Sequence, residues 1–291
     1  MPTPVLIQTG ERLGQPLMTW HPEWVQVLAD FAAASPGPTR RVDVPWYNSP
    51  LYGICPDDRF DLDTLPADVA AAVRAMGRAM WEVDVRPSTG FAHLERMTQP
   101  TGEHTGAFIA ALKDAVIEAA GEQTVGMKVP IGMGAGIEDG SFPIHTDIWP
   151  ARYLMNVFNR PAPNHEGASI FLPVSEYEPL ALAAFGPERL AHIMPILRRE
   201  VPWDDTQYDD LYGHHDHPDD TGIIAATNAA ATVVAYERGE GYLVDDAVWM
   251  HGRTVMNQED SVYDRLHRLT FDTALSFARR MEIESRAGVA A

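Results

Sequence analysis

The chain has 291 residues, of which 45% are hydrophobic, and this composition is typical of a globular protein whose core needs no disulfide bonds. Lysine and arginine number 22 against 41 aspartates and glutamates, which gives a net charge of −19. Nucleic acids and anionic membranes attract basic side chains, so this balance argues against both as partners.

Cys55 is the only cysteine in the sequence, so no disulfide can form within the chain, as expected for a reducing compartment. Residues 1–16 lack the basic start and the apolar stretch of a secretory signal, and no apolar run is long enough to cross a bilayer. We therefore expect a cytoplasmic protein, whose oligomeric state the sequence leaves open.

The first part of the chain is rich in proline, and we expect residues 1–65 to be irregular apart from one helix over 21–34. The segment PADVAAAVRAMGRAMWEV (66–83) predicts a second helix, because apolar residues recur every three to four positions and proline stands at its start. The segment TGAFIAALKDAVIEAAG (105–121) predicts a third, which ends in the glycine that helix C-termini favour. Between these two helices, residues 88–97 predict a strand.

From residue 125 onward, short β-rich runs alternate with turn residues, which is typical of a β-sandwich or barrel. Residues 176–222 interrupt this pattern with a helical piece and an Asp- and His-rich segment, as a lid or binding loop would. We predict an α+β protein with one domain over 1–291: a mainly helical flanking region (1–124) and a double-sheet jelly-roll core (125–280) that carries the insertion. The β-rich runs are TVGMKVPIG, RYLMNVFNR, ASIFLPV, ATVVAYERG, GYLVDDAVW and HRLTFDTALSF.

The tripeptide His-x-Asp, which can supply two metal ligands from the end of one strand, occurs three times. Two copies lie in the polar segment GHHDHPDD, where a solvated loop explains them. The third directly precedes the strand-like run RYLMNVF, a context in which both side chains can be aimed at one ion. The three pairs are His145 and Asp147, His214 and Asp216, and His217 and Asp219.

A metal site of two histidines and one carboxylate needs a further histidine from elsewhere in the chain. The predicted strand YLVDDAVWM ends at His251-Gly252-Arg253, which makes His251 the candidate, although it could also be an ordinary core or surface histidine. Arg265 follows at the start of the next strand, and a buried arginine there could make a bidentate ion pair with a dicarboxylate ligand.

Together, HTD, MHGR and DRLHR resemble the motifs of the Fe(II)/2-oxoglutarate-dependent oxygenases of the taurine dioxygenase and clavaminate synthase-like superfamily. The stretch NHEGASIFLPV is similar to the family's glycine–glycine–x–threonine strand, with Ser169 at the threonine and Glu166 at the first glycine. The likeness covers about residues 140–275.

The resemblance implies a distorted double-stranded β-helix in which His145, Asp147 and His251 bind Fe(II). It further implies that Arg265, assisted by Ser169, holds the 5-carboxylate of 2-oxoglutarate. The expected reaction uses O₂ to hydroxylate an unactivated C–H bond of a small molecule, either an amino acid or a natural-product intermediate. Asp147 favours hydroxylation, because related halogenases have a small residue there.

The family's second arginine stands four residues after the first, where this chain has Leu269. Arg268 is three residues after Arg265, so a regular strand turns it to the opposite face. Arg268 is therefore kept as a substrate-binding candidate. Further candidates are Trp149 and Arg152 near the first ligands, and the acidic residues Asp204, Asp205, Asp209 and Asp210, which could receive a cationic group or belong to a solvated loop.

Two other functions remain open on the sequence. A cupin-type metalloenzyme that does not use 2-oxoglutarate would have no need of Arg265. A non-catalytic binding protein would bind no iron specifically.

Overall fold

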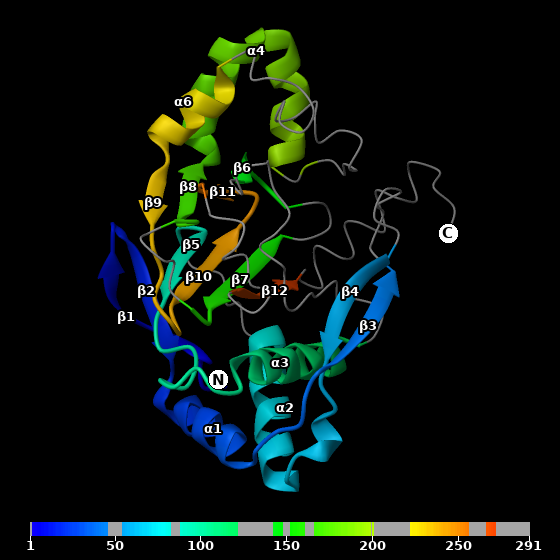
Figure 1. The fold of residues 1–291 in the computed structure, drawn as a ribbon. Coiled ribbons are helices and arrows are strands. Elements are labelled where there is room, and N and C mark those ends of the chain that lie inside the picture. The colour runs from blue at the N-terminus through cyan, green and yellow to red at the C-terminus, as the bar shows by residue number, and fades with distance from the viewer. Residues whose placement is uncertain are drawn as a thin grey trace.

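A computed structural model describes residues 2–45, 54–82, 88–121, 142–147, 152–160, 166–198, 200, 222–255 and 266–271, and every structural statement below refers to these residues. They form a mixed structure of helices and three β-sheets (Figure 1). Among them, no helix is long and apolar enough to cross a membrane.

The largest sheet has six strands in the order β1-β2-β5-β10-β7-β12. Neighbouring strands are antiparallel except for the parallel pair of β2 and β5. The strands are β1 (Leu6–Arg12), β2 (Gln15–Trp20), β5 (Phe91–Leu94), β7 (Tyr153–Phe158), β10 (Gly241–Asp245) and β12 (Leu266–Phe271).

A four-stranded antiparallel sheet has the order β6-β11-β8-β9, and a separate hairpin joins β3 and β4. The four strands are β6 (Phe142–His145), β8 (Ser169–Pro173), β9 (Thr232–Val234) and β11 (Trp249–Arg253). The hairpin strands are β3 (Arg40–Pro45) and β4 (Ile54–Arg59).

Helices cover the outer faces of the two large sheets (Figure 1). The first three pack together beside the six-stranded sheet, where Gly77 lets α2 approach Ala115 of α3 closely. The last two pack beside the four-stranded sheet, and the longer one is broken at Gly186, whose φ is 79°. The helices are α1 (Pro22–Ala33), α2 (Ala67–Glu82), α3 (Thr105–Ala120), α4 (Val174–Leu197) and α6 (Ile223–Ala230), with a short 3₁₀ helix at Leu62–Thr64.

Side-chain alternation divides each strand between an outer face and an inner face. On β12, Leu269 packs with α2 and α3 in the outer cluster, whereas Leu266 packs with the aromatic cluster between the sheets. On β8, Ile170 and Leu172 pack against α4, whereas Phe171 joins the aromatic cluster. The side chains of even-numbered residues of β12 and of odd-numbered residues of β8 therefore point into the space between the two large sheets.

The three predicted helices are confirmed as α1, α2 and α3, and Gly121 ends α3 with a φ of 88°. The prediction that residues 1–65 are irregular beyond α1 is wrong, because they also form two hairpins, β1–β2 and β3–β4. These strands have no clear apolar alternation: most β1 and β2 residues are half-buried or exposed, and strand pairing rather than burial defines them.

Most of the predicted β-runs form strands, but GYLVDDAVWM is not one continuous strand. A turn at residues 246–248 separates β10 from β11, where the amide of Val248 donates to the carbonyl of Asp245 at 2.9 Å. His251 consequently lies in the middle of β11 and not at the end of a strand. The predicted run at 124–132 and the acidic part of the insertion lie outside the described residues.

Candidate metal centre

His145 and His251 are brought together by strand pairing. His145 ends β6, His251 is central in β11, and the two are direct partners in the antiparallel register. Directly opposed residues in such a pair place their side chains on the same face. The two rings lie 4.5 Å apart between centroids, and both residues are buried.

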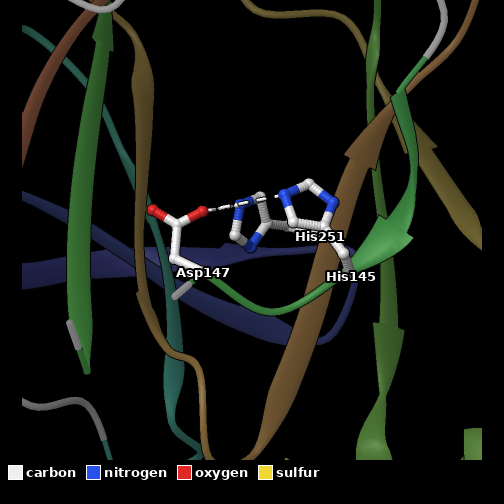
Figure 2. A group of neighbouring side chains, drawn as sticks. All are labelled: His145, Asp147 and His251. Carbon is white, nitrogen blue, oxygen red and sulfur yellow. Dashed lines mark ion pairs between the residues drawn. The ribbon is translucent and has the colours of Figure 1, made fainter. Parts of the chain in front are cut away.

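Asp147 stands two residues after His145, just past the end of β6. Its Oδ1 lies 3.6 Å from Nε2 of His145 and 3.3 Å from Nε2 of His251. Figure 2 shows the carboxylate and the two imidazoles turned toward one another. One ligand atom from each residue lies within 4.8 Å of the others. Ligands about 2.1 Å from one ion stand about 3 Å apart when adjacent, so small movements would close this group around a cation.

Hydrogen bonds to the far side of each ring select the tautomer that can bind a metal. Nδ1 of His145 lies 2.8 Å from the carbonyl oxygen of Pro143, and Nδ1 of His251 lies 3.1 Å from Oδ1 of Asp246. Both partners are acceptors, so each Nδ1 carries the proton and donates it. A neutral ring then keeps its lone pair on Nε2, the atom that faces Asp147.

The chemistry of this group fits a divalent cation. Nε2 of His251 is buried and makes no hydrogen bond to the described part of the chain, although Oδ1 of Asp147 lies 3.3 Å away. An ion pair without a hydrogen bond satisfies a buried ring nitrogen poorly, and a metal bond would replace it. A site of two imidazoles and one carboxylate on one side of an ion suits Fe(II) and leaves further coordination positions open.

The protonation states are set by burial and by neighbouring charges. Burial, assisted by the charge on His251, lowers the pKa of His145 to about 4. Burial also disfavours the charged form of His251, but the carboxylates of Asp246 and Asp147 outweigh it and raise its pKa to about 9. Burial opposes ionisation of Asp147, yet Arg268 and the two imidazoles hold its pKa well below the usual range. Without a metal, His251 is therefore cationic at neutral pH, and a metal must displace its proton.

Arg268 reaches the triad from β12. Its Nη1 donates to Oδ2 of Asp147 at 2.6 Å, and its Nε donates to Oδ1 of Asn156 at 2.8 Å. This ion pair occupies one carboxylate oxygen and leaves Oδ1 directed at the histidines. Arg268 was expected to face away from Arg265; within β12 it stands on the same inner face as Leu266.

Arg268 belongs to a row of polar side chains that crosses the inner face of the six-stranded sheet. Across the ladder, Arg268 pairs with Asn156, Asn156 with Tyr242, and Tyr242 with His93. All four are largely buried, and Nδ1 of His93 lies 2.8 Å from the hydroxyl of Tyr236. Burial raises the pKa of Tyr242 to about 12, so it stays neutral beside the triad.

Gly252 permits the close pairing that joins the two histidines. A Cβ at this position would lie 2.5 Å from the carbonyl oxygen of Phe142 and 2.9 Å from that of Pro143, both on β6. Any larger residue would push β6 and β11 apart at the register that pairs His145 with His251.

The other predicted site residues have mixed placements. Ser169 is buried on β8, on the inner face shared with Phe171, opposite Arg253 of β11. Arg152 forms a bidentate ion pair with Asp245 at 3.1 Å and lies over the ring of Tyr153, so the structure brings it to β10 and not to the triad. The candidates outside the described residues are Trp149, Asp204, Asp205, Asp209, Asp210 and Arg265, together with the other two His-x-Asp pairs.

Asp246 is a functional candidate that the sequence reading missed. Its side chain contacts both His251 and the backbone amide of Asp147. The available signal was its position five residues before His251 in a stretch rich in aspartate, but the neighbouring Asp245 gives the same signal and has a different partner.

No family model matches the chain, and no curated protein matches it. Solved structures that match this chain include an asparagine oxygenase in complex with Fe(II), 3-hydroxyasparagine and succinate, at 14% identity and a TM-score of 0.45, covering 90% of this chain and 94% of that one.

A second similar structure is the non-heme iron oxygenase OrfP with Fe and L-homoarginine, at 15% identity and a TM-score of 0.36, covering 92% of this chain and 97% of that one. The function proposed below therefore rests on the residues of the site.

Proposed function

We propose that this protein is a mononuclear non-haem Fe(II) oxygenase that uses 2-oxoglutarate and O₂ to hydroxylate an unactivated C–H bond of a small molecule. The observation that carries this proposal is the buried group of His145, Asp147 and His251, with both Nε2 atoms facing one carboxylate oxygen. When bound, the iron would supply C–H oxidation by O₂, coupled to decarboxylation of 2-oxoglutarate to succinate and CO₂.

The protein's own contribution is geometry and a dry environment. Pro143 and Asp246 hold the two rings in the metal-binding tautomer, and Arg268 fixes the carboxylate. Aromatic side chains pack beside the histidines, with the ring of Tyr242 6.5 Å from that of His251. Such a surrounding excludes water and strengthens the electrostatic interactions within the site.

We propose that the two large sheets are the halves of a distorted double-stranded β-helix within a single domain. The order β6-β11-β8-β9 is one layer, and β5-β10-β7-β12 faces it across the aromatic cluster. Jelly rolls pair two antiparallel sheets in this manner. The lid role expected for residues 176–222 is part of this proposal, and the described helix of this insertion, α4, packs on the outer face of the four-stranded sheet.

We propose Arg268 as the anchor for a carboxylate of 2-oxoglutarate, assisted by Ser169 on the inner face of β8 in the other large sheet. Arg268 supports this role because its guanidinium already stands at the triad and carries five N–H donors. Arg265, the candidate from the sequence, lies outside the described residues. Arg265 remains the alternative that the experiment below tests.

The primary substrate is proposed as an amino acid or a natural-product intermediate, and the single cysteine supports a cytoplasmic location. The acidic residues Asp204, Asp205, Asp209 and Asp210 would suit an ammonium or guanidinium group. A net charge of −19 supports a small-molecule substrate over nucleic acid.

The test is to add Fe(II) and then 2-oxoglutarate to metal-free protein without oxygen. The visible charge-transfer absorption of the resulting complex is then measured. We expect a band in the wild type that is lost in His251→Ala, and succinate release in air when the correct amino acid is supplied. Iron binding without a band would favour a metalloenzyme that does not use 2-oxoglutarate. Absence of iron binding would favour a binding protein.

A further inference from the structure

Asp147 lies beyond the last residue of β6, so strand pairing does not hold it in place. Its backbone amide donates instead to Oδ2 of Asp246, at 2.7 Å. Asp246 is fully buried, in the turn that joins β10 to β11. Where the strand ends, a side-chain carboxylate thus accepts the hydrogen bond that a backbone carbonyl of a neighbouring strand would otherwise accept.

The same carboxylate contacts the other half of the triad. Oδ1 of Asp246 accepts the Nδ1 proton of His251 at 3.1 Å. One residue is therefore bonded to two of the three candidate ligands, which come from segments about a hundred positions apart in the sequence.

The backbone of this turn is fixed independently of the triad. The amide of Asp246 donates to the carbonyl of Arg152 at 2.8 Å, and that of Asp245 donates to the carbonyl of Gly90 at 2.8 Å. The carboxylate of Asp246 is consequently presented from a rigid frame that β5 and β7 support.

We propose that Asp246 is a positioning residue that fixes His251 in its metal-binding tautomer and simultaneously sets the place of Asp147. This inference rests on the proposed metal-dependent function. Residues that orient metal ligands in this manner change metal affinity about 10- to 100-fold when mutated.

Asp246→Asn is the informative variant because it keeps the volume and removes one acceptor. An amide offers one acceptor oxygen, whereas the structure requires two, for the amide of Asp147 and for Nδ1 of His251. If the amide nitrogen faces His251, the ring must place its proton on Nε2, where it blocks metal binding. If it faces Asp147, the backbone amide of Asp147 loses its acceptor.

Asp245 provides a matched control one residue away. It is also a buried aspartate, but its carboxylate pairs with Arg152 and accepts from the amide of Ala247. Asp245→Asn should lower folding stability without changing the triad.

The experiment measures Co(II) affinity by equilibrium titration, together with amide exchange at Asp147 in the metal-free protein. We expect Asp246→Asn to weaken Co(II) binding about 10- to 100-fold and Asp245→Asn to leave it within about threefold. Circular dichroism checks that Asp246→Ala is folded. In the folded variant we expect the amide hydrogen of Asp147 to exchange about tenfold faster than in the wild type.

Unchanged Co(II) affinity in Asp246→Asn would overturn the proposal, and so would an equal loss in Asp245→Asn. Unchanged exchange at Asp147 in both Asp246 variants would overturn it even if affinity fell. Wild-type protein that binds Co(II) but shows no oxygenase activity would refute the proposed function and leave this inference standing. Wild-type protein that binds no metal would refute both.

Discussion

Nη1 of Arg268 donates to Oδ2 of Asp147 at 2.6 Å, while Oδ1 of the same carboxylate faces both histidines. The two oxygens of one aspartate thus have separate partners, a guanidinium on β12 and a candidate metal position between β6 and β11. This division favours binding of the ion through a single oxygen, because the other is held by a charge-assisted hydrogen bond.

Replacement of Arg268 should affect the co-substrate more than the metal. We expect Arg268→Ala to raise the 2-oxoglutarate concentration for half-maximal charge-transfer absorption about 10- to 100-fold, the usual effect of removing a hydrogen bond to a charged group. Arg268→Lys should recover part of this loss, because it restores the charge without the fork of donors.

The same 2-oxoglutarate concentration is measured for Arg265→Ala. A large rise in Arg265→Ala with none in Arg268→Ala would identify Arg265 as the anchor. An unchanged 2-oxoglutarate concentration in both variants would count against either arginine as the anchor of a 2-oxoglutarate carboxylate.

Metal binding should stabilise the protein through His251. At a Co(II) concentration about 100 times its Kd, we expect the free energy of unfolding to rise by about 2.7 kcal/mol in the wild type. His251→Ala should show no rise, because it removes one of the three ligands. The control is His217→Ala, in the segment GHHDHPDD, which should behave as the wild type. Thermal unfolding with and without Co(II) is measured for all three proteins.

Metal affinity should depend on pH through one group. His251 has a pKa of about 9, His145 one of about 4, and Asp147 one well below its usual range. Between pH 5 and pH 9, only the proton on His251 must leave, so Co(II) affinity should rise about tenfold per pH unit and level off above pH 9. Equilibrium titrations one pH unit apart measure the slope, and a flat profile across this window would contradict the assigned protonation state of His251.

Gly252→Ala should damage both stability and metal binding. The new Cβ would meet two β6 carbonyl oxygens, at 2.5 and 2.9 Å, so the strands must shift where His145 and His251 pair. We expect a loss of about 1–3 kcal/mol in unfolding free energy. Gly37→Ala is the control, because its Cβ would meet nothing within 4 Å. A fully stable Gly252→Ala protein with wild-type metal affinity would show that the close approach is dispensable.

The sequence by itself predicted elements whose signals are local. Helical periodicity and end residues predicted α1, α2 and α3, and short β-branched runs predicted most strands of both large sheets. It also selected His145, Asp147 and His251 as a group, because residue type and strand context are both visible along the chain. The hairpin of β1 and β2 was missed because most residues of its strands are half-buried or exposed and have no clear alternation.

Only the tertiary structure decided which side chains meet that group. Arg268 reaches Asp147 because β12 pairs with β7 in a register that turns even positions inward, and Asp246 reaches both halves of the triad because a turn separates β10 from β11. Local sequence does not specify register between strands distant in the chain, and a shift of one residue would exchange the two faces. Asp245 and Asp246 are adjacent and of the same residue type, yet in the fold Asp245 pairs with Arg152 and Asp246 with His251.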